Sequence, residues 1–440
     1  MRKLAFLAVI TFAASAAAQD TPVMTPDGCV KTASDWFNHA YQAARDSAAM
    51  PGGKPADARG LLAQRLDRIK GCAAQFSVAG TSGASLLQLA TLYTTIGNDS
   101  LAAAAVQKRL AEPSLSASAK ADALAALVAV YTKPDTVLIQ RAEPFMKELD
   151  AMPGMVPQRI AAHARLNGEY RYLDVDSRIE EHSRAIIGLA KGIKLAPLSQ
   201  VARDPGAVDA FTVLVAYTDL AEVYGDMGKV DSALMVLDQA GRDHPEVTPD
   251  DASRILQPER ERYELVGTVA PPVAADHWLN APGSTRTFDP KGNVMLIEFT
   301  AHWCVPCRNS YPSMVEMASR FEPQGVKFLF ATQFYGYLGT SGPLDPPAEF
   351  AADHSYYVDE HDITFPVAVA DQPVRKLATD PYLPNPNDAA YKVGGIPQIV
   401  VIDKHGVIRR IVTGWDAGNA VRLSVLMDEL LKETDARHPL

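Results

Sequence analysis

Hydrophobic residues follow two different periods along the chain, and the change lies near residue 266. Before that point apolar residues recur at helical spacing, with almost no strand-like alternation. After it, short apolar runs alternate with helical patterns and with turns rich in Gly and Pro. The pattern predicts an all-α helical domain over residues 28–265 and an α/β domain over residues 267–437.

One stretch of the helical domain fits the spacing of a tetratricopeptide-like hairpin, with Gly228 at the turn and Pro245 after the second helix. A weaker copy surrounds Gly97. We therefore predict a helical-repeat fold, and a generic helical bundle remains the alternative. Such a domain offers a concave surface to a protein partner, or it serves only as a scaffold for the C-terminal domain. The positions of the stronger copy are Tyr217, Leu220, Ala221, Tyr224, Gly228, Ala233, Leu237, Ala240 and Pro245.

The C-terminal pattern predicts a strand–helix–strand unit followed by a hairpin and a helix. Residues 294–299 form an apolar run that is typical of a buried strand. The other expected elements are helices at 31–47, 56–76 and 250–264, a Pro/Gly loop at 51–53, a helix at 311–321, a strand at 326–331, a helix at 348–360, an extended segment at 363–367, a hairpin of 398–402 with 407–412, and a helix at 419–432.

The first residues have the composition of a secretory signal peptide. Arg2 and Lys3 precede an apolar stretch, and Ala16 to Ala18 form an A-x-A cleavage site. We expect cleavage near Ala18 and export, to the periplasm in a Gram-negative cell. An uncleaved membrane anchor is the alternative, although the stretch is shorter than the roughly 20 residues of a spanning helix. The net charge of −10 argues against nucleic-acid binding, which requires a basic face.

Four cysteines suit an exported protein, because disulfides persist in oxidising compartments. Cys29 and Cys72 lie on neighbouring predicted helices and are expected to form a structural disulfide. On the loop-entropy relation such a bridge stabilises the fold by about 4 kcal/mol. Two buried free thiols are the alternative.

The other two cysteines, Cys304 and Cys307, stand two residues apart between a predicted strand and a predicted helix. Structural zinc requires four ligands, and the chain has no second pair of this kind. Haem attachment requires His after the second cysteine, where Arg308 stands. We therefore expect no metal and no cofactor, and thiol–disulfide exchange remains. A helix N-terminus favours the thiolate of Cys304, Cys307 can resolve the mixed disulfide, and Pro306 is tolerated in the first turn.

These residues carry a family resemblance. Glu298, Phe299, Ala301, Trp303, Cys304, Pro306 and Cys307 together resemble the active-site strand and turn of the thioredoxin superfamily. With Ala270-Pro271, residues 363–367 and Gly395-Ile396-Pro397, the chain is most similar to the TlpA/ResA-like exported thiol–disulfide oxidoreductases. The resemblance covers roughly residues 268–436 and implies a thioredoxin-like fold there.

The resemblance implies further roles. Pro397, after Ile396, matches the family's cis-proline, which packs against the dithiol. Glu298 matches the buried acid that exchanges protons with the resolving cysteine, and a carboxylate on a buried strand has a raised pKa. A carboxylate at the strand edge that faces water is the alternative. His302 either tunes the thiolate of Cys304 or is an exposed loop histidine.

The chain departs from the family at two positions. Ser310 stands where some cytochrome-maturation members carry a second acid, and Gln398 stands where Thr is common, which can change the polarity of the substrate groove. Two loops, at residues 332–347 and 379–388, are longer than usual. These loops either form a rim that contacts the substrate or are solvent-exposed loops without such a role. The candidate rim residues are Tyr335, Tyr337 and Tyr382.

These observations predict an exported thiol–disulfide oxidoreductase that reduces protein disulfides, with Cys304 as the nucleophile. The reducing direction rests on Pro306, and the family implies a membrane thiol electron donor. A disulfide oxidase or isomerase would use the same residues. A peroxidase is disfavoured because Ala301 stands where it requires Thr. A different alternative is an interaction protein whose helical domain binds a partner while the dithiol is incidental.

Overall fold

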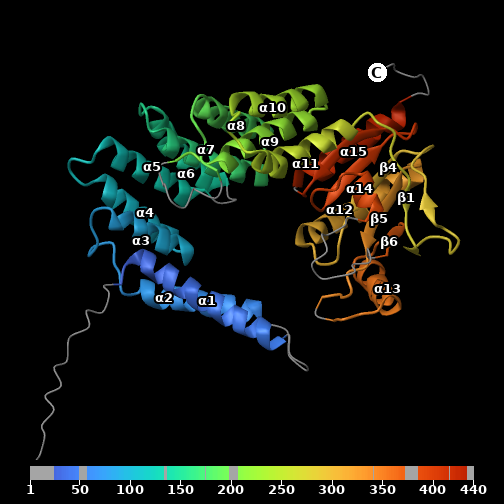
Figure 1. Ribbon diagram of the computed structural model, residues 1–440, viewed down its shortest axis with the longest axis horizontal. Coiled ribbons are helices and arrows are strands. Elements are labelled where there is room, and N and C mark those ends of the chain that lie inside the picture. Colours follow the sequence, from blue (N-terminus) through green and yellow to red (C-terminus); the bar gives the residue numbers. More distant parts are fainter. Residues whose placement is uncertain are drawn as a thin grey trace, which may run out of the picture. The chain divides into compact units, whose positions relative to one another are not determined.

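The computed structural model describes residues 24–48, 57–132, 136–173, 175–197, 207–339, 341–371, 385–415 and 417–433 (Figure 1). The predicted signal peptide, the Pro/Gly loop at 51–53 and Tyr382 lie outside these residues. The chain divides into two compact units, Met1–Glu112 and Pro113–Leu440. This division falls inside the predicted helical domain.

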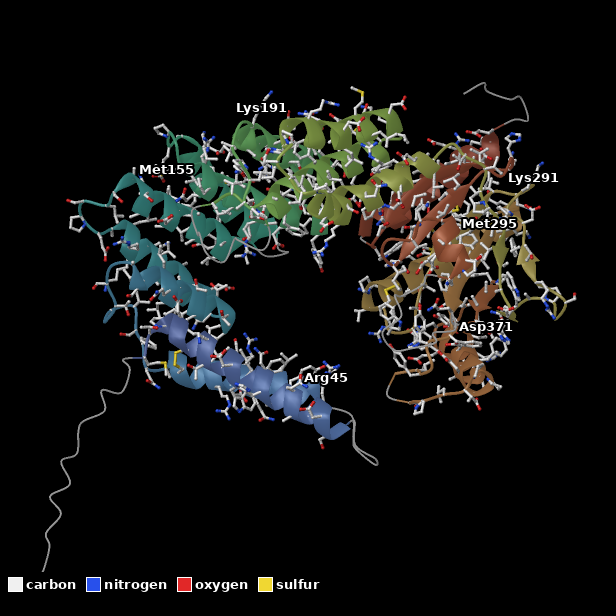
Figure 2. All side chains as sticks on the ribbon, viewed as in Figure 1. Arg45, Met155, Lys191, Lys291, Met295 and Asp371 are labelled. Carbon is white, nitrogen blue, oxygen red and sulfur yellow. A yellow bond between two sulfur atoms is a disulfide. The ribbon has the colours of Figure 1, made fainter. Side chains whose placement is uncertain are left out.

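The first unit contains two pairs of helices. Asn98 caps α4 by accepting a hydrogen bond from the backbone N–H of Leu101, and Gly97 turns the chain before it with φ +77°. A disulfide joins Cys29 of α1 to Cys72 of α2, and Figure 2 shows it as a yellow bond. The helices are α1 Pro26–Ala48, α2 Ala58–Ala73, α3 Ser85–Thr95 and α4 Asp99–Leu110.

The second unit begins with further helices that pack on one another in chain order. Gly228, with φ +72°, connects α9 and α10 as the hairpin pattern predicts. A helical N-terminal region is confirmed, while its tetratricopeptide-like character remains a prediction. The helices are α5 Ala117–Tyr131, α6 Thr136–Asp150, α7 Val156–Tyr172, α8 Asp176–Ala190, α9 Ala210–Asp226, α10 Val230–Asp243 and α11 Pro249–Leu265.

Helix α11 leads from α9 and α10 to the sheet, as Figure 1 shows. Tyr263 near its end is buried in the helical core, whereas Leu265 packs against the core of the sheet. The next turn joins the sheet directly, because the N–H of Gly267 donates to the carbonyl of Ile408 at 2.8 Å. The helices and the sheet of this unit are therefore packed on each other at this helix.

The sheet has the strand order β2-β6-β5-β4-β7-β8. β4, β5 and β6 run parallel, and β2, β7 and β8 pair antiparallel at the two sides. The five residues of β4 are all buried, as the apolar run predicts. The strands are β1 Val273–Ala274, β2 His277–Leu279, β3 Thr287–Phe288, β4 Met295–Phe299, β5 Lys327–Gln333, β6 Val367–Ala370, β7 Gln398–Ile402 and β8 Ile408–Thr413.

Helices cover both faces of this sheet. Tyr311, Met314 and Phe321 of α12 and Met427 of α15 lie in one core, while Tyr391 after α14 lies in the other. Successive residues of a strand point to opposite faces, so Glu298 shares the α12 face with Leu296. The helices are α12 Val305–Phe321, α13 Pro346–His354, α14 Pro386–Ala390 and α15 Ala417–Lys432, with a π-helical turn at Ser355–Glu360.

Most predicted elements of this part agree with the structure, with some differences. Helix α12 begins at Val305, as the expected place of Cys304 at a helix N-terminus predicts, six residues before the start expected from its apolar pattern. The extended segment predicted at 363–367 overlaps strand β6 only at Val367. The pair β1 and β3 was not predicted, because a strand of two residues is too short to show alternation.

Candidate active site

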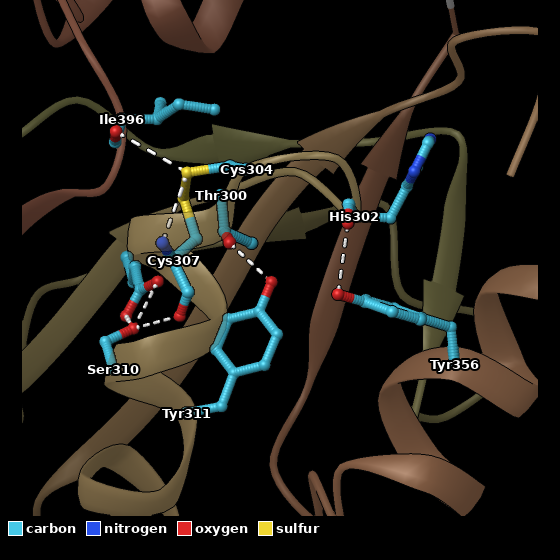
Figure 3. The surroundings of a disulfide bond; sticks show 9 residues. Thr300, His302, Cys304, Cys307, Ser310, Tyr311, Tyr356 and Ile396 are labelled. Carbon is cyan, nitrogen blue, oxygen red and sulfur yellow. Dashed lines mark hydrogen bonds between the residues drawn. A yellow bond between two sulfur atoms is a disulfide. The ribbon is translucent and has the colours of Figure 1, made fainter. Parts of the chain in front are cut away.

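The cysteine pair lies where the polypeptide leaves β4 and enters α12. Cys304 is the N-cap residue of α12, in an extended conformation, and its Sγ lies 3.2 Å from the N–H of Cys307. The two sulfur atoms form a disulfide (Figure 3). Cys304 is 4% exposed and Cys307 is fully buried. After reduction, this N–H and the other unpaired N–H groups of the first turn favour the thiolate of Cys304.

Glu298 lies behind the pair, on the face of β4 that packs against α12. Its side chain is fully buried, which excludes a carboxylate facing water. Burial raises the pKa of Glu298 to about 8, and hydrogen bonds from Ser310 and Thr300 oppose this rise. A carboxyl group with this pKa can accept or release a proton near neutral pH.

Ser310 connects this acid to the first turn of α12. Its Oγ lies 2.9 Å from each carboxyl oxygen of Glu298 and 2.6 Å from the carbonyl oxygen of Cys307 (Figure 3). One hydroxyl has one proton and therefore donates to one acceptor at a time. A protonated Glu298 can donate to Ser310 while Ser310 donates to the Cys307 carbonyl. This geometry suits the protonated form of Glu298.

The segment opposite the disulfide carries the predicted proline. The Ile396–Pro397 peptide bond is cis. The carbonyl oxygen of Ile396 lies 3.6 Å from Cys304 Sγ, so the reduced thiol can donate to it (Figure 3). Gln398 does not reach a groove, because its side chain is buried and donates to the carbonyl of Tyr391 at 2.9 Å.

His302 is buried, which excludes the exposed loop histidine. The edges of Tyr335, Tyr337 and Tyr356 surround its ring, and the hydroxyl of Tyr356 donates to its carbonyl at 3.1 Å. Burial lowers the pKa of His302, so the ring is neutral at physiological pH. A neutral ring supplies packing and no positive charge, which leaves the predicted tuning of Cys304 as an untested expectation.

Large apolar side chains are exposed at and near the cysteine turn. Trp303 is 48%, Val305 54% and Tyr337 38% exposed. The rings of Trp303 and Tyr335 meet edge to face at 5.7 Å, which joins the loop after β5 to the cysteine turn. The predicted rim residues Tyr335 and Tyr337 therefore lie at the site, and Tyr382 lies outside the described residues.

A buried carboxylate holds this loop. Glu349 of α13 is 1% exposed and accepts the backbone N–H groups of Tyr335 and Gly336 at 2.6 and 2.7 Å. Sequence reasoning assigned no role to Glu349. A glutamate in the first turn of a helix is common, and its partner here lies in another segment.

Sequence reasoning also missed Ser310 as a site residue and noted it only as the replacement of an acid. Its spacing of three residues from Cys307 on a helix places both on one face, which is the signal that was available. Thr300 and Tyr311 were missed as well, and their hydroxyls lie 2.8 Å apart beside Glu298.

Among the described residues, no three side chains of His, Cys, Asp or Glu are grouped to hold a metal ion. The helices within the described ranges also include none long and apolar enough to cross a bilayer.

Known proteins resemble the C-terminal part of the chain. Residues 266–411 match the sequence model of the AhpC/TSA family. The thiol-disulfide oxidoreductase ResA of Geobacillus kaustophilus is 28% identical over 129 residues, which are 29% of this chain and 59% of the relative. The thioredoxin-like protein YneN of Bacillus subtilis is 26% identical over 126 residues, which are 29% of this chain and 59% of that relative. The chain therefore spans less than two thirds of these relatives.

Solved structures also match part of the chain. A thiol-disulfide isomerase from Corynebacterium glutamicum is 23% identical to this chain, with a TM-score of 0.30. The match covers 38% of this chain and 98% of the isomerase chain. A thioredoxin family protein from Chlorobium tepidum is 20% identical to this chain, with a TM-score of 0.27. The match covers 38% of this chain and 97% of that protein's chain. The part of the chain that matches the AhpC/TSA family model, residues 266–411, therefore contains a thioredoxin-like sheet with the cysteine turn at the end of β4.

Proposed function

We propose that the protein is an exported thiol–disulfide oxidoreductase that reduces disulfides of protein substrates. The observation that carries the proposal is the Cys304–Cys307 disulfide at the N-terminus of α12, with the first cysteine 4% exposed and the second fully buried. The relatives named thiol-disulfide oxidoreductase support it. Export is supported by the signal-like pattern of the first residues, and it implies a membrane thiol electron donor.

The reaction proceeds in two exchanges. The thiolate of Cys304 attacks one sulfur of the substrate disulfide, whose other sulfur leaves as a thiolate and takes up a proton. Cys307 then loses its proton and attacks Cys304 Sγ, which releases the second substrate thiol. Two electrons pass from the protein dithiol to the substrate, and the protein ends with the disulfide that the structure contains.

The surroundings assist each exchange. The N–H of Cys307, 3.2 Å from Cys304 Sγ, stabilises negative charge on that sulfur in the first exchange. Glu298 lies against the turn that carries Cys307, and because its pKa is raised, its ionised form readily takes up the proton released in the second exchange, which leaves the protonated form that suits the geometry beside the disulfide. Ser310 holds this carboxyl group at the turn through its contacts with both residues.

Insulin reduction by dithiothreitol tests the proposal. We expect the wild-type protein to accelerate precipitation of the insulin chains and Cys304→Ser to show only the uncatalysed rate, because no nucleophile remains. Cys307→Ser should accumulate a mixed disulfide through Cys304. Equal rates for the wild type and Cys304→Ser would exclude this activity.

The direction is tested by equilibration with glutathione. A reductase should have a potential below the value of about −180 mV of protein disulfide isomerase. A potential near the value of about −120 mV that is typical of DsbA would assign the protein as an oxidase instead.

A further inference from the structure

A cavity of about 620 Å³ lies beside the active site, within the second unit. Helices α7, α8 and α9 form one wall. The other wall comes from α12, the end of β8 and α15. The acidic and aromatic residues of the lining include Tyr172, Asp176, Asp219, Glu222, Asp226 and Trp415.

This cavity adjoins the elements that hold the disulfide. Asn309, two residues after Cys307 on α12, is part of the lining. Gly414 is another lining residue, and its N–H donates to the carbonyl of Pro397 at 2.8 Å. Trp415 packs against the hydrophobic core that contains both cysteines. The cavity is therefore adjacent to the segments that flank the disulfide on two sides.

The lining has more carboxylates than cations. Four carboxylates, those of Asp176, Asp219, Glu222 and Asp226, face two guanidinium groups, those of Arg171 and Arg422. Arg171 contacts both Asp219 and Glu222, at 2.8 and 3.2 Å, so one cation serves two acids. Arg422 lies 3.6 Å from Asp226.

Two more arginines, Arg262 and Arg410, lie near this lining. Both form an ion pair or a hydrogen bond with groups other than the lining carboxylates. Arg262 pairs with Glu259. Arg410 donates to the backbone carbonyl of Asp226 at 2.6 Å. Burial raises the pKa of Asp219 and that of Asp226 to about 7, so both acids are partly protonated near neutral pH and ionise more fully when a cation binds beside them.

Aromatic rings accompany the carboxylates. Tyr172 is 68% exposed at the cavity, and Trp415 lines it from the other wall. Carboxylates together with aromatic faces form the combination that binds the ammonium or guanidinium group of Lys and Arg.

We propose that this cavity receives a lysine- or arginine-bearing segment of the protein substrate, beside the disulfide that is being reduced. The helical part thereby selects substrates, and the thioredoxin-like part reacts with them. The inference rests on the proposed function and names its substrate class.

Two short peptides test the inference. Each is closed by one intramolecular disulfide, and they differ only in carrying two lysines or two glutamates beside it. The second-order rate constant of the reduced protein is measured with each peptide and with bis(2-hydroxyethyl) disulfide, which is small and neutral. We expect the wild type to prefer the lysine peptide by about fivefold, as one or two ion pairs allow, and the preference to fall in high salt.

The variants Glu222→Gln and Tyr172→Ala should each reduce this preference, and the double variant should bring it within about twofold. Glu148→Gln, an exposed glutamate of α6 outside the lining, is the matched control and should retain it. Tyr172 is largely exposed, so its replacement does not disturb the core.

The two proposals fail differently. A wild type that reacts with bis(2-hydroxyethyl) disulfide but does not distinguish the peptides would overturn the inference alone. A preference that persists in the double variant would overturn it too. A wild type that reacts with none of the three disulfides would instead contradict the proposed function.

Discussion

At the scale of single residues, the site depends on an acid that has no charged partner in its surroundings. Glu298 lies in the centre of a sheet, where water cannot solvate its carboxylate, and its hydrogen bonds come from the neutral hydroxyls of Ser310 and Thr300. Neutral donors only partly compensate a buried charge. The carboxyl group therefore keeps its proton at a pH where an exposed glutamate has lost it.

The variant Glu298→Gln should change how stability depends on pH. The unfolded chain ionises Glu298 near its ordinary value, whereas the folded protein holds the proton up to about pH 8. The stability that this group contributes is thus fully present below pH 4.5 and is lost as the pH rises through 8. Between these values the wild type should lose up to about 1.4 kcal/mol per pH unit more than the variant. Urea unfolding between pH 5 and 8 measures this difference.

Other buried acids add their own pH dependence, so only the difference between proteins is informative. Glu316→Gln, an exposed residue of α12, is the control and should follow the wild type. Parallel stability curves for the wild type and Glu298→Gln would contradict a raised pKa of Glu298.

At the scale of elements, two helix N-termini organise the site. The first turn of α12 holds Cys304, and the first turn of α13 places Glu349 where it accepts two N–H groups of the loop after β5. That loop carries Tyr335 and Tyr337 against His302. The position of this loop, the predicted rim, therefore depends on a carboxylate that contacts no sulfur.

The variant Glu349→Gln should loosen this rim. A glutamine of the same shape has one acceptor oxygen, and its amino group faces one of the two N–H groups that the carboxylate accepted. We expect a loss of about 1–3 kcal/mol in the free energy of unfolding, as for a buried donor without a partner. We also expect a larger fall in the rate with protein disulfides than with bis(2-hydroxyethyl) disulfide. Urea unfolding and the two rates measure these effects.

Glu360→Gln serves as the control, because Glu360 is exposed after α13 and should change neither quantity. An unchanged stability of Glu349→Gln would show that the loop does not depend on this carboxylate.

At the scale of the whole molecule, different interactions stabilise the two compact units. The first unit has a disulfide between α1 and α2 that closes a sequence separation of 43 residues. The second unit joins helices to sheet through α11, where Arg262 donates to Thr413 and Gly267 donates to Ile408. The stability of the first unit should therefore respond to reduction of Cys29–Cys72, and the chemistry of the second should not.

The double variant Cys29→Ser/Cys72→Ser tests this separation. Loss of the cross-link should destabilise the first unit by about 4 kcal/mol on the loop-entropy relation. Proteolysis within residues 57–112 should accelerate, while the rate with bis(2-hydroxyethyl) disulfide should equal that of the wild type. Unchanged proteolysis would show that helix packing alone holds this unit.

Much of the domain organisation follows from local patterns. The helical periods, the buried run at β4 and the hairpin of β7 and β8 were predicted, because each depends on residues close together in the chain. The short strands β1 and β3 were not predicted, and neither was α14, since five residues do not show a helical period. The apolar pattern of α12 begins only near residue 311, because Pro306 and the cysteines interrupt it, and the expected place of Cys304 at a helix N-terminus indicated the true start.

The sequence by itself determined the chemistry of this protein. Two cysteines two residues apart, a preceding strand with Glu298 and the Ile396-Pro397 segment are local features, and together they indicate dithiol exchange. Only the tertiary structure decided what surrounds them. Ser310 meets Glu298, Glu349 meets the loop after β5, and the acids of α8 and α9 meet the end of β8. These contacts join side chains and loops of different elements, and they arise from packing that no local pattern encodes.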